Sequence, residues 1–166
     1  MSFRIEDKLL INNNQLFEFK NYLINNNGKI LFPKRSVQSL YFDNYRNQMH
    51  IDSEEGCVPR KKIRIRNYPK DNKHENYNLE IKISSIEGRF KKSKSINILN
   101  YDRIIKRGYI DIQYGLCFPN TLINYTREYF KVFDSRITID TKIYYQRFGS
   151  TNEKINDDEI VVEIKT

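Results

Sequence analysis

The 166-residue chain contains no alanine and no tryptophan, and only two cysteines and two histidines. Alanine is the strongest helix former, so its absence beside 23 isoleucines and 12 tyrosines favours strands over an all-helical bundle. Cys57 and Cys117 lie far apart, which predicts reduced thiols rather than a zinc site or a disulfide framework. With only His50 and His74 available, histidine-based metal sites and Ser-His-Asp or Cys-His catalysis are disfavoured. Any chemistry must therefore use Arg, Lys, Asp, Glu and Tyr.

Long apolar segments are also missing. No run approaches the roughly 20 residues that span a bilayer, and the charged N-terminal segment lacks the apolar core of a signal peptide. We therefore expect a cytoplasmic protein. The absence of any G-x-x-x-x-G-K motif excludes a P-loop kinase. The length predicts one domain over residues 1–166, large enough to bury a core without staples.

The chain is basic, with 29 Lys and Arg against 21 Asp and Glu and a net charge of +8. This balance suggests an anionic partner, and nucleic acid is one candidate. Residues 107–114, RGYIDIQY, begin like an RNP1 motif, but Ile110 and Asp111 stand where a small residue and an aromatic belong. We therefore expect no nucleic-acid partner.

Hydrophobic periodicity predicts about eight strands and two or three helices. The expected strands are residues 3–11, 36–44, 61–68, 78–84, 88–98, 121–133, 135–145 and 160–166. The expected helices are residues 14–26 and 100–109, with 45–59 as a loop or short helix and 146–159 as a loop. This pattern indicates an α+β protein built on an antiparallel sheet.

Charged side chains recur at alternate positions of five expected strands, and side chains at i and i+2 of a strand point the same way. The sets that share a face are Arg4, Glu6 and Lys8; Arg64 and Arg66; Glu80 and Lys82; Arg136, Thr138 and Asp140; and Glu163 and Lys165. One interpretation is a sheet with one solvated face, where such ion pairs contribute a few tenths of a kcal/mol. Alternatively, a sheet that wraps would gather these faces inside a barrel. Converging cations then require an anionic ligand, most simply a polyphosphate with a divalent metal held by the carboxylates.

Seven short motifs carry a family resemblance. They are R-x-E-x-K at 4–8, SLYFDN at 39–44, KIRIRNY at 62–68, LEIK at 79–82, Y-x-R at 125–127, RITIDT at 136–141 and VVEIK at 161–165. In this order, from residue 3 to the end, they resemble the VTC family, whose polyphosphate polymerase domains belong to the triphosphate tunnel metalloenzyme superfamily. The resemblance implies an antiparallel, CYTH-like tunnel barrel with a few helices packed outside. It also implies binding of ATP and inorganic polyphosphate in a basic tunnel.

The resemblance also implies roles for individual residues. Those expected to act on the reacting phosphates are Lys8, Arg64, Arg66, Lys82 and Arg136. Those expected to bind phosphate along the wall are Arg4, Lys92, Lys94, Arg127 and Lys165. Glu163 is expected to hold Mn²⁺ or Mg²⁺, with Glu6 and Glu80 as further carboxylates.

The activity implied is transfer of the γ-phosphate of ATP to polyphosphate. With water as the acceptor, the same site would be a tripolyphosphatase or nucleoside triphosphatase. Family domains continue past the VVEIK strand into a helix and a closing segment, so we expect either a fragment or a tunnel left open at its C-terminal end. A non-catalytic polyphosphate-binding module is therefore an alternative. Because family members often work beside membrane subunits, a membrane-protein partner is a further expectation.

Overall fold

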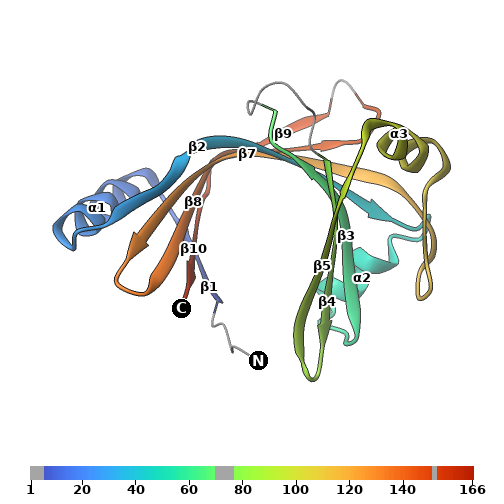
Figure 1. Cartoon of the computed structure of the whole chain (residues 1–166), viewed down its shortest axis with the longest axis horizontal. Coiled ribbons are helices and arrows are strands. Elements are labelled where there is room, and N and C mark those ends of the chain that lie inside the picture. Colours follow the sequence, from blue (N-terminus) through green and yellow to red (C-terminus); the bar gives the residue numbers. More distant parts are fainter. Residues whose placement is uncertain (1–5, 70–76, 151–152) are drawn as a thin grey trace. The chain divides into compact units, whose positions relative to one another are not determined.

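The computed structural model describes residues 6–69, 77–150 and 153–166, which form ten strands and three helices (Figure 1). The strands are β1 (Glu6–Ile11), β2 (Lys29–Asp43), β3 (Arg60–Asn67), β4 (Tyr77–Ser85), β5 (Gly88–Ile96), β6 (Tyr109–Asp111), β7 (Gly115–Val132), β8 (Ser135–Arg147), β9 (Lys154–Asp157) and β10 (Ile160–Lys165). The helices are α1 (Asn13–Asn25), α2 (Gln48–Glu54) and α3 (Ile98–Arg107).

The strands form one mostly antiparallel sheet in the order β1-β10-β8-β7-β2-β3-β4-β5, with β6 paired to β7 and β9 paired to β8. Among the described residues this pairing path has β1 at one end and β5 at the other, so it is not closed into a ring. The expected α+β class, an antiparallel sheet with a few helices, is confirmed.

The chain divides into two compact units. Unit 1 comprises Met1–Val37, Asn124–Tyr145 and Ile155–Thr166, and unit 2 comprises Gln38–Ile123 and Gln146–Lys154. The long strands β2 and β7 contribute residues to both units. Each unit has its own apolar core and its own charged strand face.

The core of unit 1 lies between α1 and the apolar side chains of β7, β8 and β10. Its buried members are Leu23, Val132, Ile137, Ile139, Ile160 and Val162. Helix α1 begins with a capping box, in which Asn12 Oδ1 accepts from the Gln15 backbone N–H at 3.0 Å and Gln15 Oε1 accepts from the Asn12 N–H at 2.9 Å. The chain leaves α1 through Gly28, where a Cβ would lie 2.7 Å from the Leu23 carbonyl oxygen. Only glycine therefore allows this close approach.

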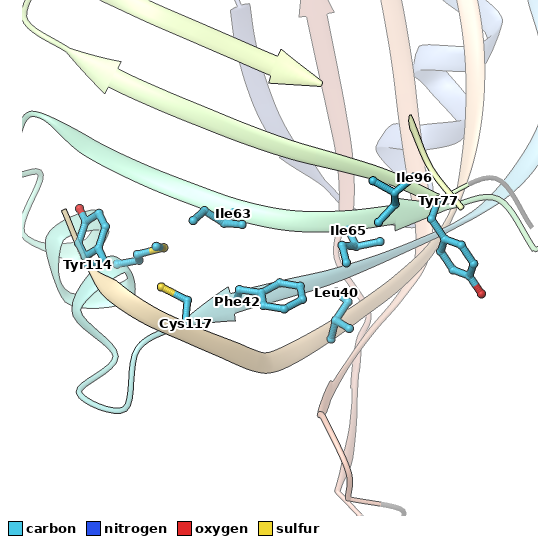
Figure 2. Close-up of a cluster of buried hydrophobic side chains, with 9 residues drawn as sticks. Leu40, Phe42, Ile63, Ile65, Tyr77, Ile96, Tyr114 and Cys117 are labelled. Atoms are coloured by element: carbon cyan, nitrogen blue, oxygen red, sulfur yellow. The ribbon is translucent and has the colours of Figure 1, made fainter. Parts of the chain in front are cut away.

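The core of unit 2 lies among β2, β3, β4 and the start of β7, with α2 and α3 packed on it (Figure 2). Its buried members are Leu40, Phe42, Met49, Ile63, Ile65, Tyr77, Ile96, Tyr114 and Cys117. Asp43 ties α2 to the end of β2, because its carboxylate accepts from the backbone N–H groups of Met49 at 3.0 Å and His50 at 2.9 Å. Tyr101 of α3 stacks on Tyr77 with ring centroids 4.0 Å apart.

The structure departs from the sequence-based expectations in the short or proline-containing strands. Strand β6 begins at the last residue of the expected helix 100–109, and β9 falls in the expected loop 146–159; three and four residues are too few to show alternation. Strand β2 begins at Lys29 rather than residue 36 and passes through Pro33, and β7 begins at Gly115 and passes through Pro119. Proline usually marks the end of a strand, but it is tolerated where the ladder does not need its N–H.

Candidate functional site

In unit 2 the charged side chains of β3, β4 and β5 form rows across the sheet. Arg64 pairs with Glu80, which pairs with Ser93, and Lys62 pairs with Lys82, which pairs with Lys91. Directly paired residues of antiparallel strands project from the same face of the sheet. The three lysines, together with Arg64, Arg66 and Glu80, therefore share one face, which we call the basic face.

Arg64 is the centre of the basic face and is almost fully buried, at 6% exposure. Its Nε and Nη2 lie 2.7 and 2.5 Å from Glu80 Oε2, and its Nη1 donates to Tyr41 Oη at 2.9 Å. Lys91 Nζ donates to the other Glu80 oxygen at 2.5 Å. Beside this cluster, Arg66 Nε donates to Ser39 Oγ at 3.1 Å. The guanidinium of Arg64 is thus held in one orientation by neighbours on two strands.

The ionisation of this cluster follows from its charges. Burial alone would raise the pKa of Glu80, but the charge of Arg64 and hydrogen bonds from Lys91 and Arg64 lower it to about 2. Burial would likewise raise the pKa of Tyr41, and the Arg64 guanidinium lowers it on balance. For Arg64 burial acts to lower the pKa, while Tyr41 and Glu80 raise it overall. Glu80 and Arg64 are therefore both ionised at neutral pH.

The basic face carries far more positive than negative charge. On β3, β4 and β5, seven cations share this face with one carboxylate, a net charge of +6; the cations are Arg60, Lys62, Arg64, Arg66, Lys82, Arg89 and Lys91. Lys62, Lys82 and Lys91 are exposed, and Lys82 lies directly opposite both of the others, so these like charges repel, while Glu80 offsets the charge of Lys91. An anion bound along this row would relieve the repulsion.

The register of β5 separates the predicted lysines from this face. Lys92 pairs with Ile81 and Lys94 pairs with Leu79, so both project with the apolar side chains on the opposite face. Lys91 occupies the position on the basic face, and sequence reasoning missed it, as it missed Lys62. The two-residue turn between β4 and β5 makes Ser85 pair with Gly88. This pairing decides which face of the sheet each later side chain of β5 occupies.

In unit 1 a second charged face runs across β1, β10 and β8. Glu6 pairs with Lys165, which pairs with Arg136, and Lys8 pairs with Glu163, which pairs with Thr138. Lys165 Nζ lies 2.6 Å from Glu163 Oε1 and 3.3 Å from Glu6 Oε2. Predicted residues from three strands are thus brought together. Burial would raise the pKa of Glu163, but Lys165, Arg127 and Lys8 lower it overall.

Arg127 of β7 forms a bidentate ion pair with Asp140 of β8. Its Nε and Nη2 lie 2.5 and 2.6 Å from the two carboxylate oxygens. Burial opposes the charged guanidinium, while Asp140, Tyr125 and Glu163 raise the pKa of Arg127 overall. Arg127, which the family resemblance predicts to bind phosphate, is therefore paired with Asp140 within unit 1. The sequence pattern does not predict this partner. The remaining predicted residue, Arg4, lies outside the described residues.

The carboxylates of unit 1 can be tested as metal ligands. No group of three or more His, Cys, Asp or Glu side chains that could hold a metal occurs in residues 6–69, 77–150 and 153–166. Mg²⁺, however, is often held by one or two carboxylates with phosphate oxygens and waters in the other positions. Glu6 and Glu163 converge on one ammonium, and the Thr138 hydroxyl opposite Glu163 is buried without a hydrogen-bond partner. This set fits a metal that binds together with phosphate, whereas Glu80 serves as the counter-ion of Arg64 and Lys91.

The fold can be compared with solved structures, of which 26 chains match. A Bacillus halodurans protein, provisionally named an adenylate cyclase, superposes with a TM-score of 0.66 at 10% identity, over 99% of this chain and 80% of that chain. A Vibrio parahaemolyticus protein with the same provisional name gives 0.57 at 15% identity, over 98% and 75%. Both likenesses have TM-scores above 0.5 at low identity, so they show a shared fold and nothing about function.

The family is shown by the sequence itself. The chain matches the VTC domain over residues 3–166 and belongs to the VTC domain family, as its motifs predicted. No curated protein matches the chain. No helix in the described part of the chain is long and apolar enough to cross a membrane.

Proposed function

We propose that the chain binds the phosphates of ATP and inorganic polyphosphate and transfers the γ-phosphate of ATP to the polyphosphate chain. The observation that carries the proposal is the basic face of unit 2. Its row of three exposed lysines lies beside two buried arginines, and Glu80, which contacts Lys91 and Arg64, is the one carboxylate on this face of β3–β5, so the excess positive charge favours a polyanion. Membership of the VTC domain family supports phosphate as that anion.

The protein's part in such a transfer is positioning and charge neutralisation, because phosphoryl transfer needs little covalent chemistry from side chains. Arg64 and Arg66 offer forked donors that match phosphate oxygens, and Lys62, Lys82 and Lys91 offer point charges. In the reaction the bond between the γ-phosphorus and its bridging oxygen breaks, a new bond forms to the terminal phosphate of the chain, and ADP leaves.

Unit 1 contributes carboxylates and further cations. Glu163 and Glu6 would hold Mn²⁺ or Mg²⁺, and Lys8, Arg136 and Lys165 would supply positive charge to phosphate. The metal, when bound, would neutralise charge between adjacent phosphates. We also propose a cytoplasmic location, where ATP is available, and, from the family resemblance, a membrane-protein partner.

The binding part of the proposal is tested with tripolyphosphate and two adjacent lysines. Lys91→Gln removes a cation from the basic face, whereas Lys92→Gln makes the same change one residue later on the opposite face. By isothermal titration calorimetry we expect Lys91→Gln to weaken binding roughly tenfold or more, the size of one lost charge-assisted hydrogen bond. Lys92→Gln should bind like the wild type. Equal losses in the two variants would contradict a site on this face, and tighter binding of RNA than of polyphosphate would favour a nucleic-acid binder.

The catalytic part is tested with ATP, polyphosphate and either metal. Metal-dependent release of ADP with growth of the polyphosphate chain supports the polymerase, and we expect Glu163→Gln to abolish it while tripolyphosphate still binds. Release of phosphate from ATP or tripolyphosphate without chain growth would instead make the chain a triphosphatase. Tight binding without turnover under any of these conditions would make it a non-catalytic polyphosphate-binding module.

A further inference from the structure

The hairpin formed by β6 and the start of β7 exposes an apolar face in unit 2. Ile110 pairs with Leu116 across the hairpin, Phe118 lies two residues further along β7, and Ile112 lies in the turn that follows β6. Their exposures are 78% for Ile110, 104% for Ile112 and 44% for both Leu116 and Phe118. These four large apolar side chains on one hairpin present roughly a few hundred Å² of apolar surface, the size of the largest patch on a typical monomer, which is often functional.

The opposite face of the same hairpin belongs to the folded core. Cys117 is fully buried, and Asp111 is held by Lys61, whose Nζ lies 2.9 Å from both carboxylate oxygens. Tyr114 at the turn donates to Asp52 of α2 at 2.7 Å. The hairpin is therefore fastened to unit 2 from its inner side, and its outer side chains lie on a fixed surface rather than a frayed end.

Cations border the apolar face. Helix α3 ends with Lys106 and Arg107, both exposed, and Gly108 follows at once. A Cβ at Gly108 would lie 2.8 Å from Leu116 Cδ1 and 3.3 Å from Phe118 Cδ1, so these apolar side chains cover the residue next to Arg107. The apolar face and the basic end of α3 are thus continuous. Arg103 adds a third exposed cation on α3, against the single carboxylate of Asp102 on the same helix.

We propose that this face, Ile110, Ile112, Leu116 and Phe118 with Lys106 and Arg107 beside it, docks the chain on an anionic lipid surface. Apolar side chains that enter the headgroup boundary, together with cations that meet acidic headgroups, suffice for reversible interfacial binding. A stable protein interface needs about 800 Å² from each partner, more than these four side chains present. The charge of the border and the small apolar area therefore both favour a lipid surface over a second protein.

The test uses the whole chain and vesicles of phosphatidylcholine with and without phosphatidylserine in a flotation assay. We expect binding only to vesicles that contain phosphatidylserine. The double variant Ile110→Ser/Ile112→Ser should weaken it about tenfold or more, because two exposed isoleucines no longer enter the lipid. Lys106→Gln/Arg107→Gln should weaken it several-fold and reduce its salt dependence. Ile24→Ser, at a 72% exposed isoleucine of α1 in unit 1, is the matched control and should bind like the wild type.

Three outcomes would overturn the proposal. One is failure of the wild type to bind phosphatidylserine vesicles. Another is loss of vesicle binding on adding tripolyphosphate or in Lys91→Gln, which would assign the lipid to the basic face. The third is self-association in analytical ultracentrifugation that the isoleucine double variant removes, which would make a second copy the occupant. Unchanged thermal unfolding and tripolyphosphate affinity of the hairpin variants would show that fold and phosphate site are intact.

Discussion

Replacing Glu80 with glutamine should destabilise unit 2 through the arginine that it leaves behind. The side chains of Glu80 and Arg64 are only 6% and 7% exposed, and Glu80 is the carboxylate that binds the Arg64 guanidinium. Removing one partner of a buried ion pair costs about 3–5 kcal/mol, because the other charge stays buried without compensation. Glutamine keeps one accepting oxygen, so we expect the lower end, about 3 kcal/mol. For a chain of this length, that corresponds to a fall in Tm of roughly 6–12 °C.

The pH dependence gives an independent measure of the same pair. The pKa of Glu80 falls from 4.5 in the unfolded chain to about 2 in the folded one. Because the folded value is the lower, the carboxylate contributes stability that is fully present above about pH 4.5 and is lost as the pH falls toward 2. A shift of about 2.5 units corresponds to at most about 3 kcal/mol. Urea unfolding followed by circular dichroism should show a wild-type advantage over Glu80→Gln at pH 7 that closes near pH 2.

The matched control is Glu128→Gln in unit 1. Glu128 accepts from Lys20 at 3.0 Å and Lys34 at 3.2 Å, but these lysines are 37% and 51% exposed, and such pairs contribute about 0–1 kcal/mol. Two results would refute the reasoning. One is an equal loss of unfolding free energy in Glu80→Gln and Glu128→Gln, and the other is a stability difference between the wild type and Glu80→Gln that persists near pH 2. Adding tripolyphosphate should stabilise Glu80→Gln more than the wild type, because a phosphate can replace the missing carboxylate beside Arg64.

Three further results are expected. The native chain should take up one alkyl group at exposed Cys57 and a second only after denaturation, since Cys117 is fully buried and burial raises its thiol pKa to about 11; mass spectrometry that finds two groups in the native chain would be inconsistent with this. Arg127→Lys should lower the free energy of unfolding by about 1–3 kcal/mol, because an ammonium cannot reproduce the two hydrogen bonds to Asp140; an unchanged urea midpoint would argue against the pair. Gly108→Ala should cost more than about 1 kcal/mol, since φ is +79° and the new Cβ would lie 2.8 Å from the Cys117 carbonyl oxygen; thermal unfolding at the wild-type Tm would contradict that geometry.

The charged strand faces show how far sequence pattern reaches. Alternation within one strand placed Arg64 with Arg66 and Glu163 with Lys165, because the side-chain period of two is local to the strand. It did not show that Arg64 meets Glu80 and Tyr41, since those contacts depend on which strands are neighbours and in what register. Alternation alone therefore grouped the charges without pairing them.

Strand β5 shows that the pairing register decides which of two adjacent lysines lies on the basic face. The sequence predicts a strand over residues 88–98 after a glycine turn, in agreement with β5, and the family resemblance implies phosphate binding by Lys92 and Lys94. The hairpin register instead places Lys91 beside Glu80. A slip of one residue moves every side chain of a strand to the other face, so the face of a ligand is decided by pairing rather than by composition.

The sequence by itself determined the family, the antiparallel strands and the sharing of faces within each strand. Missing alanine, abundant isoleucine and alternating charges are local properties, and they follow from how side chains fit a pleated surface. Only the tertiary structure decided which charges neutralise each other across strands: Glu80 with Arg64 and Lys91, Asp140 with Arg127, and Glu6 with Lys165. It alone left Lys62, Lys82 and Lys91 in one exposed row. These outcomes depend on contacts between residues of different strands, and the periodicity within one strand does not encode which strands pair or in what register.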